Sequence, residues 1–130
     1  MMNGFLFFGA INCLLSVGLG AFGAHKLRES LAEESMRAFE VGVNYQMSHG
    51  LAMLFIALAL HIWPGQKLMS TAAYLLTTGL VLFCGSLYIL ALTEVRRVAG
   101  FPVGIITPIG GSCFIAGWCC LVVAALRLPQ

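Results

Sequence analysis

The charged residues divide the chain into four long stretches that carry no charge, at 1–24, 41–66, 68–93 and 98–126. A helix needs about 20 apolar residues to cross roughly 30 Å of hydrocarbon, and each stretch is long enough. Backbone groups inside lipid must bond within their own segment, which favours helices, and the alternating pattern of a membrane barrel is absent. The pattern therefore predicts an all-α integral membrane four-helix bundle with up-down topology, as a single domain over 1–130. We expect helices over 4–24, 44–63, 68–93 and 108–126.

The stretch between the first two uncharged windows holds most of the charged residues. Ser30 and Glu33 have the spacing of a capping box, and Glu33 and Arg37 form an i,i+4 pair in the favourable order. Polar and apolar residues fall on opposite faces of a helix drawn through this stretch. We therefore expect a short amphipathic helix over 30–43 that lies at the membrane interface. The alternative is a continuous extension of the second spanning helix, with Gly42 as a bend.

The composition places the chain far from soluble domains. Hydrophobic residues make up 60% of the sequence and charged residues 9%, with a mean hydropathy of +0.95, whereas soluble domains carry about 25% charged residues. The net charge of +2 is too small for the dense basic face of a nucleic-acid-binding protein. We therefore expect the lipid bilayer, and no nucleic acid, as a partner.

Few residues in the chain suggest catalysis or metal binding. The cysteines lie inside the apolar stretches without the C-x-x-C spacing of a metal site, so we interpret them as small packing residues. Serine, histidine and acidic residues do not combine into a recognisable catalytic set. We therefore predict no catalytic residue, no metal site and no cofactor. The cysteines are Cys13, Cys84, Cys113, Cys119 and Cys120.

Small residues recur along three of the predicted helices at spacings that let helices approach closely. We expect the later helices to pack around the small-residue stretch at 18–25. The last stripe, which contains Gly117, should face the first helix or a partner subunit. A four-helix bundle needs fewer such stripes, so their number favours a homo-oligomer. The residues assigned to helix packing are Gly9, Ser16, Gly20, Gly23, Gly79, Ser86, Gly110 and Gly117.

The distribution of lysine and arginine predicts an orientation through the positive-inside rule. With four crossings, both termini and the loop near 62–67 lie on one side, which carries Lys67 and Arg127. We expect loops 25–43 and 94–107 in the cytoplasm and both termini outside. The side predicted to be cytoplasmic carries the other five basic residues, Lys26, Arg28, Arg37, Arg96 and Arg97.

The same topology gathers many polar side chains in the half of the bundle that we expect to be cytoplasmic. His49 lies about one turn inside the membrane, where polar residues are costly and often functional, although a structural hydrogen bond would also account for it. The candidates for ligand binding, lipid binding or a structural polar cluster are His25, Tyr45, Gln46, His49, Tyr88, Arg96, Arg97 and Thr107.

Two combinations of these candidates suggest specific chemistry. His25 and His49 could hold a metal, haem or a quinone, although a closed zinc site needs four ligands. Arg96 and Arg97, beside the free N–H groups of a helix that starts near Thr107, could bind the phosphate of an anionic lipid. Basic residues at this side of a membrane protein also occur simply to fix its topology.

Several short motifs, taken as a set, resemble those of one family. They are Gly20–His25 (GAFGAH), Tyr45–Gln46 with His49, Gly85–Tyr88 (GSLY), Thr107–Gly111 (TPIGG) and Gly117–Trp118. In their order and spacing the chain resembles the domain-of-unknown-function 423 family, the YwdK/YgdD-like small bacterial membrane proteins, over essentially its whole length. The resemblance implies a multi-pass protein of the bacterial cytoplasmic (inner) membrane. It supplies no activity.

Three functional interpretations follow. The leading one is a non-enzymatic bundle that packs with itself, with lipid or with a partner protein. The second is a small oligomeric transporter or channel, favoured by the polar side chains around His49 and opposed by the lack of acidic residues in the predicted spans. The third is a haem- or quinone-binding subunit, or a membrane enzyme, that uses His25 and His49.

Overall fold

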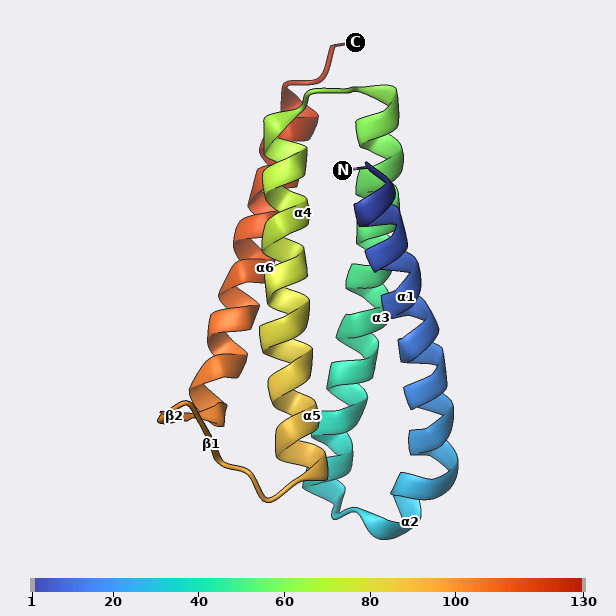
Figure 1. Cartoon of the computed structure of the whole chain (residues 1–130), viewed down its shortest axis with the longest axis vertical. Helices are drawn as coiled ribbons and strands as arrows, with labels where there is room; N and C mark the ends of the chain where they lie inside the picture. The colour runs from blue at the N-terminus through green and yellow to red at the C-terminus, as the bar shows by residue number, and fades with distance from the viewer. Residues whose placement is uncertain (1, 130) are drawn as a thin grey trace.

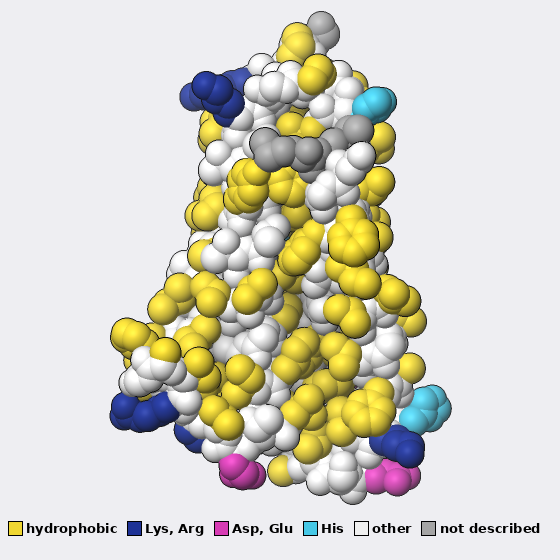
Figure 2. Space-filling view, viewed as in Figure 1, with side chains coloured by type: hydrophobic (Ala, Val, Ile, Leu, Met, Phe, Trp, Pro, Cys, Tyr) yellow, Lys and Arg dark blue, Asp and Glu magenta, His cyan; other side chains and the backbone are white. Residues whose placement is uncertain are grey.

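A computed structural model describes residues 2–129 of the chain. Four helical segments are long and apolar enough to cross a membrane. They run alternately up and down, so that both termini lie toward the same end (Figure 1). The predicted all-α fold with four spanning helices is confirmed. Figure 2 shows charged side chains gathered at the two ends of the molecule, with hydrophobic side chains along the visible face between them.

The first spanning segment is longer than predicted. Helix α1 (Met2–Phe22) continues through a π-helical turn, η1 (Gly23–Leu27), into α2 (Arg28–Ser30). The chain becomes extended only at Leu31, with φ −92° and ψ 145°. The earlier end was predicted from the charge of Lys26. Charge marks where a helix enters water, but lysine and arginine are good helix formers, so the helix continues past it.

The second segment, α3 (Glu33–Ile62), is one helix of 30 residues, about 45 Å long. The separate amphipathic helix expected over 30–43 is wrong, because residues 33–43 form the first turns of α3. The alternative, a continuous extension of the second spanning helix, is what the structure has. A β-carbon at Gly42 would lie 2.8 Å from Cε1 of Tyr88, so the glycine makes room for that ring. Since α3 exceeds the roughly 30 Å of a hydrocarbon core and its first turns carry Glu33, Glu34, Arg37 and Glu40, we expect those turns to lie outside the hydrocarbon.

The start of α3 also differs from the predicted capping box. Ala32 is the N-cap residue, and no side chain caps the helix. The hydroxyl of Ser30 instead donates to carbonyl groups of the preceding turn, because Ser30 still belongs to α2. The i,i+4 ion pair between Glu33 and Arg37 is present.

The third segment consists of α4 (Lys67–Gly79), a second π-helical turn η2 (Leu80–Cys84) and α5 (Gly85–Leu92). A short connection joins it to α3, so the two form an antiparallel helical hairpin. Single π-helical turns often occur at functional sites. Here η2 lies against α6 (Val103–Leu126), the last helix.

The loop before the last helix contains a small β-hairpin that the sequence analysis did not predict. Strand β1 (Arg97–Val98) pairs antiparallel with β2 (Phe101–Pro102). Between them, Ala99 and Gly100 have φ of 51° and 83°. Positive φ at both central positions is typical of a type I′ turn, whose twist matches that of paired strands. Alanine is unusual in this conformation, which glycine or asparagine adopts more readily.

Helix α6 begins earlier than the predicted start at 108. Its N-cap residue is Pro102, and Pro108 lies inside the helix. A proline inside a helix lacks the N–H that would bond the carbonyl four residues before it, here that of Gly104. Thr107 is therefore not the N-cap that we expected.

The helices pack as two pairs that are joined through α3. Helix α1 lies along α3, and α6 lies along α4 and η2, while α3 also contacts α5 (Figure 1). Glycines form both seams. A β-carbon at Gly9 would lie 2.9 Å from the carbonyl oxygen of Gly50, and one at Gly117 would lie 2.8 Å from Cδ2 of Leu76. The central element is therefore α3, and not the stretch at 18–25 that we expected.

The small-residue face of α1 meets α3 along its length. Gly20 lies opposite Val43, and Gly23 leaves room for the ring of Phe39. The hydroxyl of Ser16 donates to the carbonyl of Val43 across 2.8 Å. This face is used entirely within the α1–α3 pair.

The stripe of α6 faces α4 and η2, which corrects the expectation that it would meet the first helix or a partner subunit. A β-carbon at Gly110 would lie 2.9 Å from Cα of Phe83, and the ring of Phe114 covers Gly79. Since these glycines serve contacts inside one chain, the number of stripes no longer favours a homo-oligomer.

Candidate functional site

A chain of hydrogen bonds joins three helices inside the bundle. The hydroxyl of Tyr88 on α5 donates to Oε1 of Gln46 on α3 across 2.6 Å, and Nε2 of Gln46 donates to Oδ1 of Asn12 on α1 across 3.0 Å. Asn12 in turn donates to the carbonyl of Phe8 across 2.8 Å. Asn12 and Gln46 are buried. These hydrogen bonds therefore give partners to polar groups that would have none in hydrocarbon.

His49 lies where α3 meets α6. Its Nδ1 is 2.8 Å from the carbonyl oxygen of Tyr45, and its Nε2 is 3.1 Å from the indole nitrogen of Trp118. A carbonyl only accepts a hydrogen bond and an indole N–H only donates one. These partners assign the tautomer in which Nδ1 carries the proton and Nε2 accepts. The imidazole is therefore neutral, with both nitrogens occupied.

Aromatic rings surround His49. The imidazole stacks on Phe114, with centroids 3.7 Å and planes 18° apart, and on Tyr45, at 5.5 Å and 13°. Phe83 of η2 packs against Tyr45 at 4.6 Å and against Phe114 at 5.4 Å. Together the rings line a groove of about 540 Å³ between α3 and α6.

Thr107 and Ser86 form a hydrogen bond of 2.6 Å between α6 and α5. Ser86, which we assigned to helix packing, is buried and donates to the carbonyl of Phe83 across 2.9 Å. Because the Ser86 proton goes to that carbonyl, the Thr107 hydroxyl is the donor in the bond between the two side chains. Thr107 therefore joins two helices.

Arg96 and Arg97 are exposed at the end of the molecule that carries five of the seven lysine and arginine residues, which we call the charged end. Each guanidinium group donates to a carbonyl of its own loop. Within residues 2–129 neither forms an ion pair, whereas Arg28 pairs with Glu40 at 2.8 Å. Several N–H groups of both arginines therefore remain open to an anion from outside the protein.

The register of the hairpin separates its apolar side chains from its basic one. Val98 lies opposite Phe101, and Arg97 lies opposite Pro102. Opposed residues share a face of a β-ladder and adjacent residues alternate between faces. Val98 and Phe101 are 41% and 66% exposed. The hairpin therefore has one apolar face and one basic face, and Figure 1 shows that it projects sideways beyond α6.

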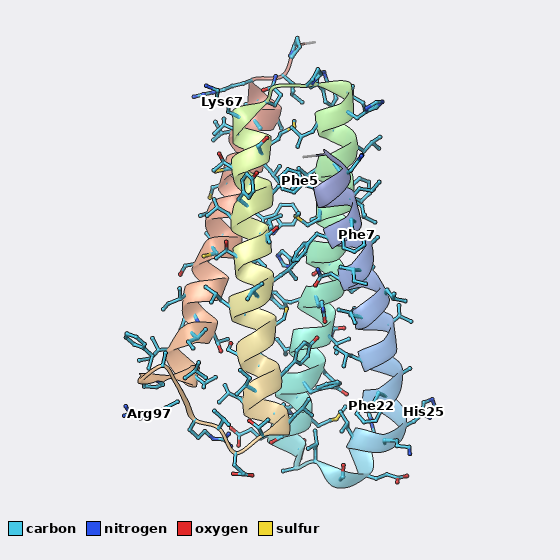
Figure 3. The ribbon with its side chains drawn as sticks, viewed as in Figure 1. Phe5, Phe7, Phe22, His25, Lys67 and Arg97 are labelled. Atoms are coloured by element: carbon cyan, nitrogen blue, oxygen red, sulfur yellow. The ribbon has the colours of Figure 1, made fainter. Side chains whose placement is uncertain are left out.

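His25 does not lie with His49. Figure 3 shows His25 pointing outward from the end of the first spanning segment, whereas His49 is buried against α6. The predicted joint use of these two histidines for haem, quinone or metal is therefore wrong. Among the described residues, no three histidine, cysteine or acidic side chains are grouped so that they could hold a metal ion.

The candidates predicted as one cluster thus fall into separate groups, divided by α3. Gln46 meets Tyr88, Thr107 meets Ser86, and the two arginines stand apart. Three aromatic residues around His49, namely Phe83, Phe114 and Trp118, were not among the candidates. A tryptophan in the interior of a span, away from the interface where tryptophan usually gathers, is the signal that could have found this group.

Four spanning helices, an interior joined by polar side chains and charges confined to the ends define a small multi-pass membrane protein. The model of the family described as "Protein of unknown function (DUF423)" matches residues 19–111. The chain belongs to this family, as its motifs indicated. No solved structure matches the chain.

The curated relatives agree in length and in class. The UPF0382 membrane protein YwdK of Bacillus subtilis is 42% identical over 126 residues, which cover 97% of this chain and 98% of the relative. A UPF0382 membrane protein of Staphylococcus epidermidis is 45% identical over 128 residues, with the same coverage. The UPF0382 inner membrane protein YgdD of Escherichia coli K12 is 40% identical over 129 residues, covering 96% and 91%. This chain is similar to each of them over nearly its full length.

Proposed function

We propose that this protein is a non-enzymatic membrane protein that binds anionic phospholipid at its charged end. The observation that carries the proposal is the two-faced hairpin. Its apolar face, with Val98 and Phe101, suits the acyl region of a bilayer, while Arg97 lies on the other face with Arg96 beside it. Guanidinium groups bind phosphate through directed, often bidentate hydrogen bonds.

The position of the hairpin supports this role. It extends sideways at the level where α6 begins (Figure 1). In this proposal Phe101 inserts into lipid while the arginines remain at the level of the head groups. A basic residue near an anionic membrane surface contributes about 1 kcal/mol. The two arginines together would therefore favour anionic over neutral lipid by about 2 kcal/mol, or roughly thirtyfold.

We also propose that the charged end faces the cytoplasm, with both termini outside, in a bacterial inner membrane. The support is the excess of basic residues at that end, five against two. The proposal does not include a homo-oligomer, because the glycine stripes that suggested one are used inside the chain.

The test compares two variants that lose the same charge. The protein would be placed in nanodiscs of mixed phosphatidylglycerol and phosphatidylcholine, released, and weighed by native mass spectrometry to count retained lipids. Arg96→Gln with Arg97→Gln should lose the preference for phosphatidylglycerol. Arg28→Gln with Arg37→Gln removes two positive charges from the same end and should keep it, because those arginines already pair with glutamates. Equal lipid retention by the two variants would overturn the proposal.

Transport is the second candidate function, and the line of hydrogen-bonded polar side chains from Asn12 through Gln46 to Tyr88 is the observation that favours it. These groups are bonded to one another, and no acidic residue occurs between Glu40 and Glu94. A cation or proton pathway usually contains one. Flux through liposomes that disappears in a Gln46→Leu variant would establish transport, and absence of flux in the unmodified protein would remove it.

A further inference from the structure

The groove between α3 and α6 differs from an ordinary lipid-facing surface. Its volume of about 540 Å³ lies within the usual 300–1,000 Å³ of small-molecule sites. Aromatic and small polar side chains line it, and the lining includes no lysine, arginine, aspartate or glutamate. An ionic head group that entered would lose its water without gaining a counter-charge. The groove therefore suits an uncharged ligand.

A second groove continues the first along the same two helices. It measures about 260 Å³, and only apolar residues line it, among them Phe55 of α3 and Leu121 of α6. Trp118 lines both grooves and so forms their common boundary. The two grooves together have one aromatic and polar end and one purely apolar end. This arrangement matches an amphiphile with a compact head and a hydrocarbon tail.

The rings of the first groove favour a flat head group. The planes of Tyr45 and His49 are 13° apart, those of His49 and Phe114 are 18° apart, and those of Tyr45 and Phe114 are 29° apart. Aromatic rings prefer offset stacking on other flat rings. Since both nitrogens of His49 are occupied and its side chain is buried against Phe114 and Tyr45, the imidazole supports the stack and is not available as a metal ligand or a base. The rings open to a ligand are those of Tyr45 and Trp118, which are 43% and 45% exposed.

The polar atoms of the groove suit oxygen substituents on such a ring. The hydroxyl of Ser112 on α6 donates to the carbonyl of Pro108 at 2.9 Å, which leaves its oxygen as an acceptor. The hydroxyl of Ser48 on α3 donates to the carbonyl of Tyr45 at 3.2 Å, and its oxygen also lies 3.3 Å from Nδ1 of His49, so it keeps at most one lone pair for a ligand. The hydroxyl of Tyr45 has no hydrogen-bond partner within residues 2–129. It is free to donate to a ring carbonyl or to accept from a ring hydroxyl.

We propose that this groove binds a prenylated quinone or its quinol, a lipid with a flat, uncharged, oxygen-bearing ring and an apolar tail. The ring lies beside Tyr45, and the tail passes Trp118 into the apolar groove. None of these residues belongs to the hairpin. The proposal therefore stands independently of the binding of anionic phospholipid.

The experiment uses Trp118 as a reporter. The chain has two tryptophans, so a Trp63→Phe background leaves only the one that lines the groove. Decylubiquinone, a short-tailed quinone that quenches indole fluorescence on contact, would be titrated into nanodiscs of phosphatidylcholine that contain this variant. We expect quenching that saturates at one ligand per protein.

Two further variants in the same background provide the comparison. Ser112→Phe fills the groove and should weaken binding by at least about tenfold. Val122→Phe adds a ring of the same size to an exposed part of α6 outside both grooves and should leave binding unchanged. Tyr45→Phe removes one hydroxyl without changing the shape of the groove, and should weaken binding by about threefold to tenfold.

Two results would overturn the proposal. Quenching that rises without saturation, equally in the Ser112→Phe and Val122→Phe variants, would mean that the quinone only collides with the protein from the bilayer. Displacement of the quinone by decane or a diacylglycerol at equal concentration, together with an unchanged midpoint for Tyr45→Phe, would mean that the groove holds hydrocarbon without recognising the ring. The Tyr45 variant keeps the test decisive even if Ser112→Phe does not fold.

Discussion

Oε1 of Gln46 accepts a hydrogen bond of 2.6 Å from the hydroxyl of Tyr88, and this bond ties the second spanning helix to the third inside the bundle. The glutamine is only 7% exposed, so water cannot replace the lost donor. We predict that Tyr88→Phe lowers the free energy of unfolding by about 1–2 kcal/mol. Unfolding by SDS titration, followed by circular dichroism, measures the change.

Tyr45→Phe is the matched control for this prediction, because it removes the same atom from a tyrosine whose hydroxyl has no partner in the described chain. Its stability should remain within about 0.5 kcal/mol of the unmodified protein. An equal decrease in the free energy of unfolding for both variants would show that the hydrogen bond between Gln46 and Tyr88 does not stabilise the protein.

The two adjacent glycines of α6 should respond oppositely to alanine. At Gly110 a β-carbon would lie 2.9 Å from Cα of Phe83, and a backbone atom cannot move aside as a side chain can. At Gly111 the nearest atoms of the same residue are 3.8 Å away, which is ordinary contact. Gly110→Ala should therefore cost about 1–3 kcal/mol, whereas Gly111→Ala should be neutral or stabilise by up to about 1 kcal/mol. Thermal unfolding in detergent, followed by size-exclusion chromatography, compares the two variants directly.

The orientation can be measured by fusing reporters to the C-terminus. If the charged end is cytoplasmic, alkaline phosphatase at the C-terminus should be active, because it folds only outside, and green fluorescent protein secreted there should remain dark. Arg96→Gln with Arg97→Gln reduces the difference from five against two to three against two basic residues and should produce a mixed population. Fluorescence of a C-terminal fusion to the unmodified chain would contradict the proposal, because it would show that the C-terminus lies in the cytoplasm.

The turn of the hairpin should gain stability from one substitution and lose it from the neighbouring one. Ala99 has a φ of 51°, which costs an alanine about 1 kcal/mol or more and a glycine almost nothing. Ala99→Gly should slow amide exchange in the loop at 94–103, where the N–H of Val103 donates to the carbonyl of Arg96. Gly100→Ala, at a φ of 83°, should accelerate it. Hydrogen exchange read by mass spectrometry distinguishes these outcomes, and equal exchange in both variants would show that the turn does not control the loop.

The spanning helices were predictable because lipid leaves the backbone few alternatives. A long uncharged stretch must form a helix, so charge alone located all four segments. Their ends were not predictable in the same way. Lys26 marked the edge of the hydrocarbon, and Pro108 suggested a first helical position, yet the helices extend beyond both. Polarity reports where water begins, whereas the end of a helix depends on the local backbone.

The polar residues of the candidate site were predictable one by one, but neither their grouping nor the aromatic residues around His49 were. Polar residues inside a span attract notice individually, so Gln46, His49 and Tyr88 were found. Which of them meet depends on how α3 is rotated between its neighbours, and the sequence does not record that rotation. The small-residue stripes likewise showed that helices approach closely without showing which ones. The groove lining was missed because Phe114 looks like any other apolar residue in a span.

The division of the bundle into two helix pairs has a consequence for how the chain is made. The ribosome completes the pair α1–α3 before the pair α4–α6 exists. Among the described residues, Oε1 of Gln46 and Nε2 of His49 in the first pair accept hydrogen bonds only from Tyr88 and Trp118 of the second. An inserted first half therefore holds two acceptors without donors in lipid, at about 1–3 kcal/mol each. Association with the second half supplies the missing donors and is therefore favourable. Separately expressed fragments 1–66 and 67–130 should accordingly bind each other in a membrane and co-purify.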